Sequence, residues 1–213
     1  PREGIHVSTL LGCPRATAIE QSEPLSVDPL SMNAITTGQA WHAYMDKASI
    51  DPVYTEVEVS GYIAGVPVCG RVDRLRGDVI EDWKHSSDFS LKYTKEGAKP
   101  QHQAQLSIYA ELISQEPMAV RPTRGRIWHH FSVGGKDAMK AIEFPLWPIE
   151  QVLSFKPHDG SYTVLELLKQ AASKGPWTEL PLAGESMRFG AKSMCDYCSK
   201  FSVCKTAATG APF

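Results

Sequence analysis

The sequence lacks the features of a membrane-spanning, secreted or strongly basic protein. No stretch approaches the roughly 18 to 20 consecutive apolar residues that a membrane span requires, and no charged segment followed by an apolar run opens the chain. The formal net charge is -2, which argues against binding polyanions over a broad surface. A Gly-x4-Gly-Lys-Ser/Thr loop is also missing, so this sequence carries no nucleotide-driven motor. We expect a cytoplasmic protein with no membrane partner.

Cysteine is scarce, but its placement is informative. Only five occur among 213 residues, and four lie near the two ends of the chain: Cys13, Cys195, Cys198 and Cys204. In a reducing cytosol, clustered thiols bind metals more often than they form disulfides. The three tail thiolates form a cage that lacks one corner, which Cys13 can supply, and four thiolates suit either zinc or an iron-sulfur cluster. Cys69 lies in an apolar run and is expected to be a small buried hydrophobe.

The chain is long enough for one substantial core. With 42% hydrophobic residues, a single domain over residues 1–213 is favoured, with the segment around Cys13 and the tail 195–204 joined by the metal site. Hydrophobic periodicity predicts an α/β fold in which helices flank a mixed central sheet. The predicted strands are 54–60, 66–75, 79–85, 126–133 and 141–146, and the predicted helices are 37–48, 101–115 and 163–173. A short helix from Thr9, limited by Pro14, and a loop over 22–31 are also expected.

One predicted hairpin carries the residues of greatest chemical interest. If Gly77 and Asp78 form a two-residue turn, Asp73 faces Asp82 across the strands, at the roughly 4.5 to 5.5 Å that separates paired side chains. Period-two alternation places Lys84 on the same face as Asp82. Facing carboxylates bind a hard divalent cation, and Lys84 beside that ion could orient water or stabilise charge on a phosphate. The alternative is an exposed hairpin whose charges are solvated.

Residues on neighbouring elements extend this candidate site. Gln105 and Tyr109 lie four residues apart on the following helix and therefore share a face. His42, on an earlier helix, is a candidate third metal ligand because imidazole commonly binds metals. Glu56 and Glu58 fall on one face of an early strand, and alternation does not separate them.

Taken in order, these segments resemble a known family. Gly38 to His42, Gly70-Arg71-Val72-Asp73, Ile80-Glu81-Asp82-Trp83-Lys84 and Gln105 to Tyr109 resemble the motifs of the RecB-like branch of PD-(D/E)XK nucleases. The four terminal cysteines resemble those of the iron-sulfur subset of that branch, which includes CRISPR-associated RecB-like nucleases and the AddB nuclease domain. The resemblance spans most of the chain, from Ser8 to Cys204.

The resemblance implies a function and a set of roles. It implies metal ligation by His42, Asp73 and Asp82, catalysis by Lys84 with these carboxylates, and support from Gln105 and Tyr109 near the substrate. It also implies a 4Fe-4S cluster, in preference to zinc, on the four terminal cysteines. Magnesium or manganese would then support a DNA exonuclease that prefers single-stranded ends, in a bacterial, archaeal or phage-infected cell.

Two further functions stay open at this stage. One is a catalytically weak, nuclease-fold module that binds DNA ends for a helicase, recombination or CRISPR adaptation partner. The other is a zinc-stapled structural protein in which the hairpin charges are accidental. Because the net charge is negative, DNA binding is expected to rest on a narrow basic track through Lys92, Lys95 and Lys99.

Overall fold

The computed structural model describes residues 4–22, 29–47, 54–86, 97–118, 120–133, 136–173, 180, 183–186, 188–189, 192–198 and 204. The described helices are α1 (Val7–Leu10), α2 (Pro14–Ser22), α3 (Pro29–Lys47), α5 (Pro100–Gln115), α6 (Ile149–Ser154), α7 (Val164–Ala171), α8 (Ala183–Ser186), and the 3-10 turns η2 (Pro157–Asp159) and η4 (Met194–Tyr197). The strands are β1 (Ile5–His6), β2 (Tyr54–Ile63), β3 (Val66–Arg76), β4 (Val79–Ser86), β5 (Arg124–Val133), β6 (Lys136–Pro145), β7 (Arg188–Phe189) and β8 (Lys192–Ser193). No helix among these is long and apolar enough to span a membrane.

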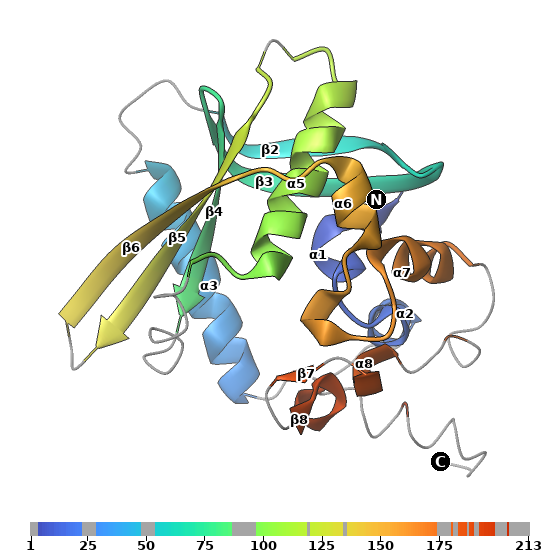
Figure 1. The fold of residues 1–213 in the computed structure, drawn as a ribbon. Helices are drawn as coiled ribbons and strands as arrows, with labels where there is room; N and C mark the ends of the chain where they lie inside the picture. The colour runs from blue at the N-terminus through green and yellow to red at the C-terminus, as the bar shows by residue number, and fades with distance from the viewer. Residues whose placement is uncertain are drawn as a thin grey trace. The chain divides into compact units, whose positions relative to one another are not determined.

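A six-stranded mixed sheet forms the centre of the fold, as predicted (Figure 1). Its hydrogen-bonded order is β1-β3-β4-β5-β6, and β2 also pairs with β3. The β3–β4 and β5–β6 pairs are antiparallel, whereas β1–β3 and β4–β5 are parallel. The chain connects the parallel strands β4 and β5 through α5, because parallel neighbours need a long crossover.

By its internal contacts the chain divides into two compact units, and both are discontinuous in sequence. Unit 1 comprises Pro1–Leu25, Tyr62–Cys69 and Ile149–Phe213, and unit 2 comprises Ser26–Gly61 and Gly70–Pro148. The hairpin residues and the histidine, glutamine and tyrosine of the candidate site all belong to unit 2. All four terminal cysteines belong to unit 1. The strands β2 and β3 contribute residues to both units.

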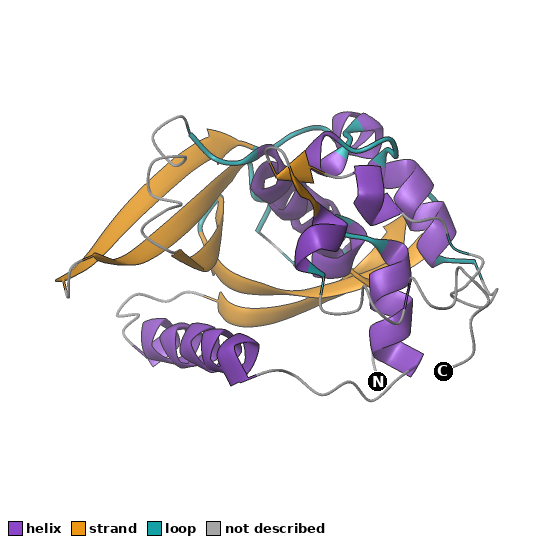
Figure 2. Cartoon of the chain, turned by 90° about the horizontal axis from the view of Figure 1, so that it is seen from below, coloured by secondary structure: helices purple, strands orange, loops and turns teal. Residues whose placement is uncertain are grey.

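Helices cover both faces of the sheet in unit 2. His129 and His130 on β5 point to opposite faces because side chains alternate along a strand. The ring of His129 lies 5.9 Å from that of His102 on α5, whereas the ring of His130 stacks at 3.9 Å on Trp41 of α3. The two helices therefore lie on opposite sides of β5 (Figure 2). The buried face of α5 is mostly apolar, and its Leu112 and Ile113 are completely buried.

In unit 1, three short helices pack around a small apolar core. Leu10 of α1, Ile19 of α2 and Leu167 of α7 are almost fully buried. A capping box fixes the start of α7, because Thr163 accepts a hydrogen bond from the Glu166 backbone while the Glu166 side chain accepts one from Thr163. Cys13, which immediately precedes α2, packs against Leu167.

Some predicted boundaries were wrong. The first helix does end before Pro14, at Leu10, but Pro14 also begins a second helix that was not predicted, because proline at the first helical position removes only a donor that has no partner there. Part of the predicted loop over 22–31 is helical, since α2 includes Ser22 and α3 begins at Pro29. The expected helix from Thr9 begins at Val7 instead.

Candidate active site

The predicted register of the β3–β4 hairpin is confirmed over the residues that pair. Arg76 pairs with Val79 and Leu75 with Ile80 across the turn. Gly77 has a φ of 58°, the left-handed conformation that a tight two-residue hairpin turn needs and glycine adopts readily. The pairing reaches Arg74 and Glu81, one step short of the two aspartates.

Beyond that last pair, a single residue of β4 holds two candidate metal ligands through its backbone. The N–H of Trp83 donates to Oδ2 of Asp73 at 2.8 Å. The Trp83 carbonyl lies 3.2 Å from Nε2 of His42, which comes from α3. Because a carbonyl only accepts hydrogen bonds, Nε2 is the donor in this contact, and the other ring nitrogen, Nδ1, faces Asp73. Nδ1 lies 3.6 Å from Oδ1 of Asp73.

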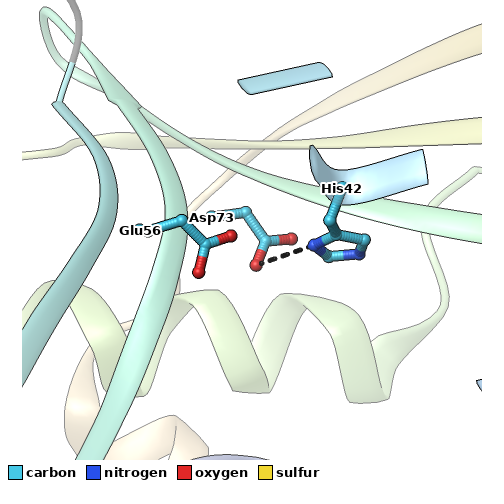
Figure 3. Close-up of side chains that lie close together, drawn as sticks. All are labelled: His42, Glu56 and Asp73. Carbon is cyan, nitrogen blue, oxygen red and sulfur yellow. Dashed lines mark ion pairs between the residues drawn. The ribbon is translucent and has the colours of Figure 1, made fainter. Parts of the chain in front are cut away.

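Glu56 of β2 completes a three-residue cluster with His42 and Asp73 (Figure 3). One ligand atom from each lies within 4.8 Å of the others. Glu56 has a φ of 50°, which is uncommon for a residue with a side chain and redirects its carboxylate relative to regular strand alternation. Glu58 is exposed and is not in the cluster, so the structure separates two glutamates that alternation left equivalent.

The carboxylate of Glu56 also has a cationic neighbour. Its Oε2 lies 2.5 Å from Nε of Arg71, whose side chain is 57% exposed. Arg71 comes from β3, two residues before Asp73. An exposed arginine next to the cluster is placed to meet an anion that approaches from solvent.

A second set of contacts surrounds Asp82. Its Oδ2 lies 2.8 Å from Nζ of Lys84, and its Oδ1 accepts from Lys84 at 3.0 Å and from Nε2 of Gln105 at 3.4 Å. Gln105 in turn hydrogen-bonds with Tyr109. A side chain at Gly70 would collide with the Tyr109 ring, so the glycine of the Gly70-to-Asp73 segment lets the tyrosine approach β3. Asp82, Lys84, Gln105 and Tyr109 thus lie together, beside the His42 cluster rather than within it.

The electrostatics of the site favour a bound cation. Burial, and then the charge of Asp82, raise the pKa of Asp73 to about 8, although the Trp83 N–H and Lys84 act in the opposite direction. Burial by itself lowers the pKa of Lys84, but the charge and hydrogen bond of Asp82 outweigh it, and the pKa is raised. Burial raises the pKa of Tyr109 to about 12. At neutral pH Lys84 is therefore an ammonium and Tyr109 a neutral phenol, and Asp73 carries a proton that a divalent cation would displace.

Two histidines beside Lys84, the buried His129 and the half-buried His102, were not predicted from the sequence. The parallel pairing of β4 with β5 sets His129 opposite Lys84, and His102 of α5 lies next to His129. Burial and the charge of Lys84 lower the pKa of His102 to about 3, and burial and Lys99 lower that of His129 to about 4. Both rings are thus neutral at physiological pH. Only the helical spacing of His102 from Gln105, three residues, could have indicated this position.

In unit 1, Gly184 of α8 lies beside two of the four terminal cysteines. A Cβ at Gly184 would lie 3.2 Å from Sγ of Cys195 and 3.6 Å from Sγ of Cys13, so glycine leaves room for both sulfurs. Burial, and then Cys13 with Glu185, Cys198 and Cys204, raise the pKa of Cys195 to about 11. Cys69 is buried, as expected.

A buried arginine also contacts the fourth cysteine. Arg15, only 6% exposed, donates through Nη1 to Sγ of Cys204 at 3.8 Å and through Nε to the Leu180 carbonyl at 2.7 Å. Its positive charge would offset negative charge on thiolates at this position. Of the predicted basic track, Lys99 is exposed immediately before α5, while Lys92 and Lys95 lie outside the described residues.

No family model and no curated protein matches the chain. Among solved structures, the crystal structure of SSO0001 is similar with a TM-score of 0.62 and 21% identity, over 97% of this chain and 88% of that one. The two proteins share a fold. Two exonuclease structures also match. One is an alkaline exonuclease from Laribacter hongkongensis, with a TM-score of 0.44 and 12% identity over 66% of this chain and 77% of that one. The other is a phage related exonuclease from Haemophilus somnus 129PT, with a TM-score of 0.47 and 9% identity over 81% of this chain and 93% of that one.

Proposed function

We propose that this chain is a metal-dependent deoxyribonuclease of the PD-(D/E)XK type. One observation carries the proposal. Where the pairing of β3 with β4 ends, three side chains that could bind a metal lie beside a lysine–carboxylate pair. His42, Glu56 and Asp73 supply the ligand cluster, and Asp82 with Lys84 supplies the adjacent pair. Trp83, whose backbone holds two of the ligands, lies between Asp82 and Lys84 in the chain.

The residues present fit a divalent cation. One imidazole nitrogen and two carboxylates form a mixed donor set that suits manganese or magnesium, and the raised pKa of Asp73 reports negative charge that a cation would relieve. Asp82, whose charge already acts on Asp73, is proposed as a further ligand. When bound, such an ion polarises the scissile phosphate and lowers the pKa of an attacking water.

The protein's own side chains would orient the reactants. Lys84 keeps its proton at neutral pH because its pKa is raised, so we assign it to stabilising charge on the phosphate and orienting water rather than to accepting a proton. Gln105 holds Asp82, and the neutral Tyr109 hydroxyl can donate to substrate. The neutral His102 and His129 rings pack beside this ammonium without adding positive charge next to it.

We further propose that Cys13, Cys195, Cys198 and Cys204 bind a 4Fe-4S cluster. The all-sulfur donor set, the space left by Gly184 and the charge of Arg15 support a site for a thiolate-bound centre, and its binding energy would contribute to folding. The ratio of iron to zinc in anaerobically purified protein tests this directly. Stoichiometric zinc without iron, after growth with abundant iron, would contradict it.

The proposed reaction is the exonucleolytic cleavage of single-stranded DNA. A partner such as a helicase would supply such single strands from duplex DNA. End-labelled linear and circular strands, incubated with Mg²⁺ or Mn²⁺, test the activity, with Lys84→Ala as the inactive variant and the exposed Lys169→Ala as its matched control. Binding without cleavage under every metal condition would instead favour the DNA-end binding module, and rapid cleavage of circles would indicate an endonuclease.

A further inference from the structure

A cavity lies between α3 and β5, on the face of the sheet opposite α5. Its volume is about 400 Å³, within the range of pockets that hold small ring-containing ligands, roughly 300 to 1,000 Å³. The residues that line it are Thr36, Thr37, Ala40, Trp41, Tyr44 and His130. All belong to unit 2, as does the His42 cluster.

Aromatic rings in near-parallel orientation line this cavity. The Trp41 ring stacks on His130 at 3.9 Å with an interplanar angle of 15°, and on Tyr44 at 5.6 Å with an angle of 27°. His130 is buried, whereas Tyr44 is 62% exposed. The stack thus begins in the core and ends at the surface, and Tyr44 presents ring surface to solvent. Offset stacking is a favoured arrangement for aromatic groups, so a flat ring is the ligand that these walls suit best.

The cavity is next to the candidate metal ligands in the chain. Trp41 directly precedes His42 on α3, and consecutive Cα atoms lie about 3.8 Å apart. The two residues therefore lie on the same turn of α3 with side chains about 100° apart, so one helix carries both a ligand of the His42 cluster and the Trp41 ring of the cavity. The cavity offers aromatic surface and two threonine hydroxyls but no charged side chain among its described lining residues, which suits an uncharged base better than a phosphate.

We propose that this cavity binds a nucleobase of the DNA strand, stacked on the exposed ring of Tyr44 at the outer end of the His130–Trp41–Tyr44 stack. The inference rests on the proposed function, because it takes DNA as the substrate. Stacking is insensitive to sequence, since every base has an aromatic face. In a chain with a net charge of -2, such a contact would supply affinity that a broad basic surface does not.

The test combines a protein change with a matching change in DNA. Single-stranded oligonucleotides carrying one abasic site, moved one position at a time, are bound to protein with the Lys84→Ala change, which keeps the strand intact, and affinity is measured by fluorescence anisotropy. We expect one abasic position to weaken binding roughly five- to 150-fold, the range for loss of one base–aromatic stack. Tyr44→Ala should weaken binding of the intact strand by a similar factor, and an abasic site at that position should then weaken binding no further. Tyr44→Phe should bind both strands as the parent protein does.

Tyr62→Ala is the matched control, because Tyr62 is similarly exposed, at 66%, and lies on β2. Equal affinities for Tyr44→Ala and Tyr62→Ala, with unchanged abasic profiles, would overturn the proposal and assign the cavity to another ligand. Cleavage of normal and wholly abasic strands by protein that retains Lys84 separates the two hypotheses. If the protein cleaves DNA but Tyr44→Ala has no effect on binding, the base site is refuted and the nuclease function stands. If binding shows an abasic profile that depends on Tyr44 but no strand is cleaved, the base site is supported and the nuclease function is refuted.

Discussion

Replacing Asp73 with asparagine should make the metal-free protein more stable, increasingly so as the pH rises. Asp73 is 13% exposed and shares its surroundings with the charge of Asp82. The asparagine side chain would keep an oxygen that can accept the Trp83 N–H, while removing the negative charge. The substitution therefore isolates the electrostatic cost of holding an ionised carboxylate at this position without a cation.

The size of the effect follows from the pKa of Asp73, which rises from 3.8 to about 8 on folding. Because the folded state binds the proton more tightly than the unfolded state, the free energy of unfolding falls as the pH increases between these values. Integration from about pH 6.5 to about pH 8.5 gives a loss of roughly 2 kcal/mol in the wild type, none of which occurs in Asp73→Asn. For a chain of 213 residues, this corresponds to a change of roughly 4 to 8 °C in the Tm difference between the two proteins.

Thermal unfolding in a metal chelator at several pH values measures this difference. Comparing the two proteins cancels the contributions of His102 and His129 to the pH dependence. Because the pKa values of these histidines are lowered on folding, they make stability rise with pH only up to their unfolded pKa of 6.5. Asp78→Asn is the control, because Arg124 lowers the pKa of Asp78 to about 2 and its contribution stays constant across the window. Mn²⁺ should remove the pH dependence in the wild type by displacing the proton. A wild-type and Asp73→Asn difference that is constant over this range would refute the reasoning.

Three further predictions test the remaining residues. Glu56→Gln should weaken Mn²⁺ binding in calorimetry by at least about tenfold, because its carboxylate is in the ligand cluster, and an equal loss in Glu58→Gln would contradict that assignment. Lys84→Ala should lower the cleavage rate by roughly 100- to 1,000-fold while DNA binding persists, and full activity would place catalysis elsewhere. Cys195→Ser should lose bound metal and lower the Tm, whereas Cys69→Ser should retain the metal, which elemental analysis would show.

The sequence by itself determined the hairpin and the order of its chemical groups. Gly77 in a two-residue turn decides which residues pair, because a tight turn leaves only one register, and period-two alternation then places Lys84 with Asp82. Contacts within one hairpin or one helix are local, so spacing alone predicts them. The same reasoning brought Gln105 and Tyr109 onto one helical face.

Only the tertiary structure decided which distant residues meet. The choice of Glu56 over Glu58 depends on a left-handed backbone conformation inside β2, which strand alternation does not anticipate. The neighbours of Lys84 depend on the parallel pairing of β4 with β5, whose register is set by packing across a long crossover rather than by a turn. That pairing places His129 beside Lys84 and directs His130 to the opposite face, where it stacks on Trp41.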